Sequence, residues 1–311
     1  MLQYLVIMLD DAATSYCHYK APSASPKGER LIPLQTLKDG IRFGMKENLM
    51  IQYVYPEQAL PDEYAPVIES IDHSKIKAIA DNADVLVVNE WKKLPTEIEI
   101  PVVIRTSKVD FFTRYKEIFP LLTNAPRVNV AFTDMEIFTE VDFETYKGLL
   151  AEIAAELERL YVAGRAPQLN LLTDRMMLTQ MNNCGAGDTT ITLAPNGKFY
   201  ICPAFYYEDE TDSIGDLEHG LDIKNKQLYK LEYAPICRHC DAYQCRRCIW
   251  LNRKLTLEVN IPSREQCVIA HLERNASREL LANIRKHGTF MPETEIKEID
   301  YLDPFDKKEE W

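Results

Sequence analysis

The sequence predicts an α/β fold, in which a parallel sheet, open or curled into a partial barrel, is followed by a small cysteine-rich module of a β-hairpin and helices. Three observations lead to this prediction. Short apolar runs typical of buried strands alternate with helical segments over residues 5–172. A hairpin pattern follows. Seven of the eight cysteines then lie between Cys184 and Cys267.

The first part reads as repeated strand and helix units. Helical spacing is seen over residues 34–48 and, most clearly, over residues 142–163, where an apolar stripe ends at Gly164. The predicted strands are residues 5–9, 50–54, 84–88, 101–105, 128–132 and 168–172. Because strands that alternate with helices pair in parallel, we expect one parallel sheet.

The second part begins with a hairpin. Residues 189–193 alternate, Pro195, Asn196 and Gly197 form a strong turn signal, and residues 198–202 return to end at Cys202. A helix over residues 268–286, ended by Gly288, should pack this module onto the first part. We therefore divide the chain into an α/β barrel part (1–178), a cysteine module (179–290) and an acidic, solvated C-terminal tail (291–311).

Composition excludes several function classes. The formal net charge of −12 argues against nucleic-acid binding, which requires clustered basic side chains. No apolar run approaches the roughly 18 residues of a membrane-spanning helix, and residues 5–9 predict a buried strand rather than a signal peptide. We expect a cytoplasmic protein with no membrane partner. In a reducing compartment, dense Cys-x-x-Cys spacing points to metal rather than to disulfides.

The closest cysteine spacing is Cys237-x2-Cys240-x4-Cys245-x2-Cys248. A zinc ribbon separates its two Cys-x-x-Cys pairs by roughly 15 to 20 residues, so that two hairpin turns can face each other. The short gap here is too small for that geometry. Iron–sulfur ligation tolerates it because neighbouring cysteines can bind different clusters. Seven cysteines suit two iron–sulfur clusters better than one, and zinc is the alternative.

The order of these seven cysteines resembles the SPASM domain of radical S-adenosylmethionine enzymes that modify peptides. The resemblance covers Cys184, Gly197-x4-Cys202, the four close cysteines and Cys267, although the family's usual gaps of five and three residues are four and two here. It implies a SPASM-like β-hairpin and helix domain that binds two four-iron, four-sulfur clusters.

Position by position, the resemblance also implies which cysteines share a cluster. One cluster would have a full set of four ligands, Cys237, Cys240, Cys245 and Cys267. The other would have three, Cys184, Cys202 and Cys248. Its fourth position stays undecided between an open iron site, His239 and an aspartate.

The first part is similar in layout to the partial parallel (βα) barrel of radical S-adenosylmethionine enzymes. That family carries Cys-x3-Cys-x2-Cys after the first strand, but here Cys17 is followed by Ala21 and Ala24 at the other two positions. Residues 53–57, Tyr-Val-Tyr-Pro-Glu, stand in place of its Gly-Gly-Glu type turn. We therefore expect no cleavage of S-adenosylmethionine. Cys17 alone is typical of a buried, small apolar residue, and no catalytic residue is assigned.

Over nearly the whole chain, the sequence resembles a narrower group, the CXXX repeat peptide maturases. The resemblance rests on residues 5–11, 14–19 and 31–56 and on the module cysteines. It implies a role in maturing a ribosomally made, cysteine-rich precursor peptide. The leading hypothesis is an iron–sulfur protein that binds and presents this peptide, beside a fully active radical S-adenosylmethionine partner enzyme. The alternatives are a cluster-dependent peptide-modifying enzyme and a zinc-binding structural or regulatory protein.

Overall fold

The computed structural model describes residues 1–19 and 30–306. Its main feature, within these residues, is an eight-stranded sheet with the strand order β6-β5-β4-β3-β2-β1-β7-β8. Neighbouring strands pair in parallel except β7 and β8, which form an antiparallel hairpin. The strands are β1 Tyr4–Met8, β2 Met50–Val54, β3 His73–Lys77, β4 Val85–Val88, β5 Val102–Thr106, β6 Val128–Phe132, β7 Thr190–Leu193 and β8 Phe199–Tyr200.

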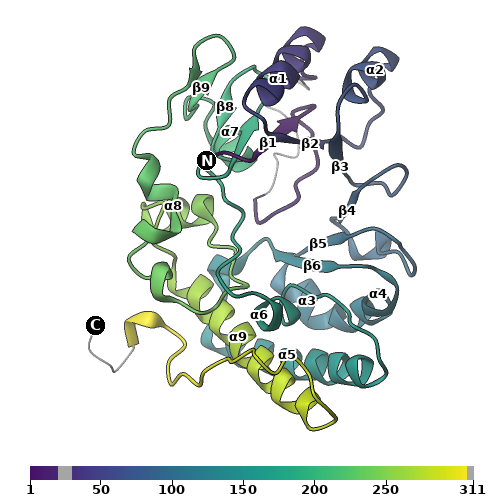
Figure 1. Cartoon of the computed structure of the whole chain (residues 1–311), viewed down its shortest axis with the longest axis vertical. Helices are drawn as coiled ribbons and strands as arrows, with labels where there is room; N and C mark the ends of the chain where they lie inside the picture. Colours follow the sequence, from purple (N-terminus) through teal and green to yellow (C-terminus); the bar gives the residue numbers. More distant parts are fainter. Residues whose placement is uncertain (20–29, 307–311) are drawn as a thin grey trace.

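Helices cover the sheet and join its strands. Figure 1 shows β1 to β6 in a curved row, with α5 and α9 side by side at the foot of the view. A small ribbon of β9 Gly215–Asp216 and β10 Gly220–Leu221 follows the hairpin. The α-helices are α1 Leu34–Lys46, α2 Ala65–Ile68, α3 Lys108–Arg114, α4 Phe119–Asn124, α5 Glu140–Val162, α6 Thr173–Met177, α7 Pro203–Glu208, α8 Ile249–Thr256 and α9 Arg264–Arg285.

The parallel α/β architecture predicted from the sequence is confirmed, as are the long helix α5 and the hairpin of β7 and β8. One strand, β3, was not predicted, because its sequence His-Ser-Lys-Ile-Lys is largely polar. It is held between β2 and β4 by backbone pairing rather than by an apolar pattern.

The strand predicted over residues 168–172 is wrong. Only one bridge forms there, between Leu169 and Val128 of β6, and the chain then turns into α6. The side chain of Asn170 takes over the role of a longer strand: its Oδ1 accepts from the backbone N of Val130 at 2.8 Å, and its Nδ2 donates to the Val130 carbonyl at 2.9 Å. A side-chain amide thus pairs with the backbone of the middle residue of β6, on the outer edge of the sheet.

The two halves of the sheet have separate apolar cores. Strands β1 to β3 and the hairpin share one core with α1, whereas β4 to β6 share the other with α3, α5 and α9. Since α9 belongs to the cysteine module, its apolar face joins the module to the first part, as predicted. Phe111, Phe132 and Tyr146 form a cluster of edge-to-face rings at the centre of this second core.

The C-terminal segment differs from the solvated tail expected. Ile296 is buried in the second core, and Asp303 is buried within 3.6 Å of Arg264 on α9. Isolated apolar side chains anchor this acidic segment over its described part, residues 291–306. Of the helices within the described residues, none is long and apolar enough to cross a membrane.

We predict that Asn170→Ala lowers the stability of the protein by about 2–4 kcal/mol, because it leaves the buried N–H and carbonyl groups of Val130 unpaired. Urea unfolding followed by circular dichroism measures the effect. Asn124→Ala is the matched control, since Asn124 makes an exposed hydrogen bond to the Thr96 carbonyl, and it should change stability by less than about 0.5 kcal/mol. Equal effects of the two substitutions would contradict the role given to Asn170.

Candidate metal-cluster sites

Four cysteines surround one cavity of about 330 Å³, which we call the thiol cavity. Three of them are residues that the sequence assigns to one cluster. The fourth is Cys17, which the sequence suggests to be a buried, small apolar residue. The side chains of this set are Cys17, Cys184, Cys202 and Cys248.

Each of these cysteines is placed by a different element. Cys202 and Cys248 are the N-cap residues of α7 and α8. Cys184 precedes a tight turn in which Gly185 and Gly187 adopt φ values of +65° and +78°, and a Cβ at Gly187 would lie 2.6 Å from the Tyr229 ring. Here, glycine is required both by the left-handed backbone and by the close approach of a side chain.

The loop after β1 is fixed by a buried arginine of β5. The Nε of Arg105 donates to the carbonyl of Cys17 at 2.7 Å, and its Nη2 donates to the carbonyl of Tyr19. The ring Nδ1 of His18 hydrogen-bonds the carbonyl of Phe132 at the end of β6, at 2.8 Å. Residues 17–19 are therefore fastened to the carboxyl ends of β5 and β6.

A second group of thiols lies in the cysteine module. Cys237 is buried in a small apolar cluster with Met181, Cys240 and Cys245. Cys267, in the first turns of α9, is electrostatically coupled to Cys245, Cys237 and Cys240. Backbone N–H groups of Ala242 and Arg247 donate to the sulfurs of Cys240 and Cys245, each at 3.4 Å, an arrangement that stabilises ligating thiolates.

Burial favours the protonated, neutral form of these thiols. It raises the pKa of Cys237 to about 11 and also raises the pKa values of Cys240, Cys245 and Cys267. Burial likewise raises the pKa values of Cys17, Cys202 and Cys248. Without a bound cation, most of these thiols are neutral near pH 7. A metal centre would supply the positive charge that ligating thiolates need.

Arg247 interacts electrostatically with thiols of both groups, Cys237 and Cys245 of one and Cys184 of the other, and also with Asp188. Its side chain is buried, and among the described residues only its Nη2 finds a hydrogen-bond acceptor, the carbonyl of Tyr229. Its backbone adopts φ +44°, a left-handed conformation that is unfavourable for arginine. Although Asp188 supplies one negative charge, the Nε and Nη1 groups of this buried cation have no acceptor among the described residues, an arrangement that further anionic acceptors would stabilise.

The residues around the thiol cavity fit a thiolate-ligated cluster. The cavity offers four sulfur donors, and the buried hydroxyl of Thr192 in its wall has no hydrogen-bond partner among the described residues. An anionic cluster in this cavity would give the hydroxyl an acceptor. No three His, Cys, Asp or Glu side chains within the described residues are arranged to hold a single metal ion.

A buried carboxyl lies at the junction of the module and β6. Glu273 of α9 lines a small cavity of about 50 Å³ together with His18, Arg246 and Cys245. Burial raises the pKa of Glu273 to about 8, and a 2.8 Å hydrogen bond from the Tyr146 hydroxyl only partly opposes this shift. Burial also lowers the pKa of His18 to about 4, so both groups are largely neutral near pH 7.

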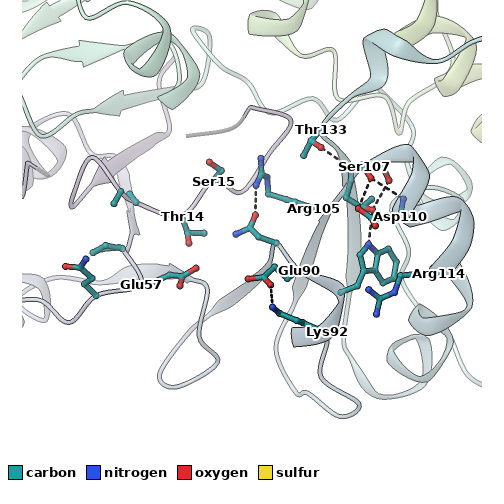
Figure 2. Close-up of a pocket in the computed structure, with 17 residues that line it drawn as sticks. Thr14, Ser15, Glu57, Glu90, Lys92, Arg105, Ser107, Asp110, Arg114 and Thr133 are labelled. Carbon is teal, nitrogen blue, oxygen red and sulfur yellow. Dashed lines mark hydrogen bonds and ion pairs between the residues drawn. The ribbon is translucent and has the colours of Figure 1, made fainter. Parts of the chain in front are cut away.

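A larger cavity of about 700 Å³, the edge cavity, lies at the carboxyl ends of the parallel strands. Figure 2 shows Thr14 and Ser15 to the left of Arg105, and charged side chains on both sides of Arg105 and below it. These charged side chains have both signs, among them Glu57, Glu90, Lys92, Asp110 and Arg114. Ligands of parallel α/β folds bind at this edge of the sheet.

The loop after β1 separates the two cavities. Thr14 and Ser15 line the edge cavity, whereas Tyr16, Cys17 and Tyr19 line the thiol cavity. Within the described residues no cysteine lines the edge cavity. Ala21 and Ala24, which stand at the other two positions of the radical-enzyme motif, lie outside the described residues.

The structure thus brings together the seven cysteines singled out by the sequence in two groups, Cys184, Cys202 and Cys248 in one, Cys237, Cys240, Cys245 and Cys267 in the other. Sequence reasoning missed Cys17 as a member of the first group, and it missed Arg247 as the buried cation that interacts with both groups. The adjacency of Cys17 and His18 just after the first strand was the available signal. His239, the fourth ligand considered, lines a different cavity with Asp241 and Arg274.

Comparisons with known proteins identify the fold. Native anSMEcpe with bound AdoMet superimposes with a TM-score of 0.61 at 11% identity, over 91% of this chain and 99% of that chain. Native anSMEcpe with bound AdoMet and Cp18Cys peptide gives 0.61 at 11% identity, over 92% and 100%. No protein-family model and no curated protein matches the sequence. The chain therefore has the fold of these structures, which confirms the fold class that the sequence resemblance implies.

We predict that Glu273→Gln changes how stability depends on pH. Because the folded pKa of about 8 exceeds the ordinary value of 4.5, the neutral carboxyl contributes stability at low pH, and this contribution is lost as the pH rises through that interval. The melting temperature of the variant, relative to wild type, should therefore increase from about pH 5 to about pH 9.

Thermal unfolding across this pH range provides the measurement. Glu279→Gln, an exposed position on the same helix, should show no such trend. Parallel profiles of wild type and Glu273→Gln would show that the carboxyl is not held in its neutral form.

Proposed function

We propose that this protein binds two iron–sulfur clusters and acts in the maturation of a cysteine-rich peptide made on the ribosome. The observation that carries the proposal is the gathering of the cysteines in two groups, both of which interact electrostatically with the buried, incompletely paired Arg247. Two anionic clusters would give this cation its partners. Cys237, Cys240, Cys245 and Cys267 would hold one cluster, and Cys184, Cys202 and Cys248 would contribute to the other.

The dimensions of the thiol cavity favour a cluster over zinc. Four zinc ligands converge on one ion at about 2.3 Å from each sulfur. The thiol cavity, at about 330 Å³, offers room for about ten water molecules at roughly 30 Å³ each. A centre with several metal ions and bridging sulfides uses such a space, whereas one zinc ion would require the cysteines to close around it.

The edge cavity is the proposed binding place for the precursor peptide. Its mixed charges and hydrogen-bonding groups suit an extended polar peptide, and it opens at the sheet edge where parallel α/β folds bind ligands. The structural neighbour anSMEcpe is known with bound AdoMet together with the Cp18Cys or the Kp18Cys peptide. The resemblance of the sequence to CXXX repeat peptide maturases supports the same class of partner.

The protein presents its peptide without cleaving S-adenosylmethionine. Cleavage by the radical mechanism requires a cluster held by three thiolates, with one iron left open for the substrate. The positions that would supply two of them are Ala21 and Ala24, and Cys17 lines the thiol cavity rather than the edge cavity. A complete radical S-adenosylmethionine enzyme would then carry out the chemistry on the presented peptide.

The alternative is that this protein itself modifies the peptide. The observation that favours it is the AdoMet bound by structural neighbours of the same fold. The two functions predict opposite results when the reduced protein is incubated with S-adenosylmethionine. A peptide-modifying enzyme would form 5′-deoxyadenosine, whereas a peptide-presenting protein would form none.

We predict that protein purified without oxygen contains about eight iron and about eight sulfide ions per chain, with little zinc, because two four-iron, four-sulfur clusters are bound. Cys240→Ala should lose about half of the iron and lower the melting temperature, since the module depends on its metal for folding. Elemental analysis and thermal unfolding are the measurements. Stoichiometric zinc with negligible iron would refute the proposed cofactors.

We predict no 5′-deoxyadenosine when the reduced protein is incubated with S-adenosylmethionine, with or without a cysteine-rich precursor peptide. Chromatography of the products, under anaerobic conditions with dithionite, gives the measurement. An active radical S-adenosylmethionine enzyme assayed in parallel controls for the reductant. Multiple turnovers would instead establish the alternative, a peptide-modifying enzyme.

A further inference from the structure

One thiol is left without a role by the proposed function. Cys17 lies 167 positions before Cys184 in the sequence, yet its side chain lines the thiol cavity with the three module cysteines. Cys17 also interacts electrostatically with Cys184, Cys202 and Cys248. These four thiols therefore form one group.

The backbone at Cys17 is held from both sides. Arg105 donates from Nε to the Cys17 carbonyl and from Nη2 to the Tyr19 carbonyl, and the ring of His18 is hydrogen-bonded to the Phe132 carbonyl. These contacts fix the loop on strands β5 and β6. The thiol is consequently presented to the cavity by a preformed support, as a ligand requires.

Two cations lie near this thiol. The Nε of Arg105 donates to the carbonyl of Cys17 at 2.7 Å. Arg246 lines the thiol cavity and donates to Asn129 Oδ1 at 3.1 Å. Positive side chains at this end of the cavity suit a negatively charged cluster.

The other donors considered for this position lie elsewhere. His239 hydrogen-bonds Arg238 and lines a separate cavity. Among the described residues that line the thiol cavity, there is no histidine, aspartate or glutamate. Within that set, the remaining oxygen donors include Tyr16, Tyr19 and Gln52, and the sulfur of Cys17 is the donor that matches the other three ligands.

We infer that Cys17 is the fourth ligand of the cluster bound by Cys184, Cys202 and Cys248. The inference rests on the proposed function, since it requires that a cluster occupies the thiol cavity. With four thiolates the cluster is closed: it has no iron free to bind a substrate thiol, and it serves structure or electron transfer. It also ties the loop after β1 to the cysteine module.

The test compares Cys17→Ala with wild type after anaerobic purification. A four-iron cluster with only three cysteine ligands readily loses its unprotected iron on mild oxidation and becomes a three-iron cluster. Ferricyanide oxidation should therefore release about one iron per chain from the variant and produce the electron paramagnetic resonance signal of a three-iron cluster. Wild type should retain its iron and show no such signal.

Cys184→Ala is the matched control, because it removes a ligand of the same cluster from the module side. It should reproduce the behaviour of Cys17→Ala, while Cys267→Ala should affect the other cluster. If Cys17→Ala fails to fold, Cys17→Ser retains a weaker oxygen donor and should show a shifted signal for the reduced cluster.

Wild type provides a test that needs no variant. Added 2-mercaptoethanol would bind an open iron site and change the spectrum of the reduced protein, so an unchanged spectrum is expected. A changed spectrum, or a wild type that already yields the three-iron signal, would overturn the assignment of Cys17 while leaving two clusters in place. A wild type without iron would instead overturn the proposed function, and with it this inference.

Discussion

The parallel pairing of β1 with β7 is the interaction on which the rest of this structure depends. It aligns residues 4–7 with residues 190–193, and so joins the sheet of the first part to the hairpin of the cysteine module. The loop that leaves β1 then faces the cysteines on either side of the hairpin, Cys184 and Cys202. Without this pairing, no backbone hydrogen bonds between β1 and β7 would hold Cys17 near residues that are so distant in sequence.

Charge balance is the second constraint. Apart from the exposed Cys184, the cysteines of both groups are buried or half-buried, and the buried Arg247 uses only part of its hydrogen-bonding capacity within the described residues. A protein interior does not tolerate an unpaired cation well. Two thiolate-ligated clusters would resolve this imbalance, because their negative charge and sulfur acceptors would meet the guanidinium. The same charges explain why metal binding and folding of this module should be coupled.

The loop after β1 gives the molecule two compartments with different chemistry. Its residues 14 and 15 face the polar edge cavity, and its residues 16, 17 and 19 face the thiol cavity. Arg105 supports the loop from β5 and also lines the edge cavity. A peptide bound at the sheet edge would therefore lie one loop away from the proposed cluster, separated from it by residues that the arginine keeps in place.

The sequence by itself determined the α/β class, the long helix, the hairpin and the set of seven cysteines, because apolar periodicity, turn residues and thiol spacing are local signals. It missed β3, whose polar residues carry no strand pattern. It also predicted a strand over residues 168–172, where the side chain of Asn170 instead forms the hydrogen bonds with the backbone of Val130 in β6. Only the tertiary structure placed Cys17 with Cys184, Cys202 and Cys248 and buried Arg247 where it interacts electrostatically with both groups. Strand order and backbone packing bring these residues together across more than half of the chain, and no local pattern in a single sequence records such proximity.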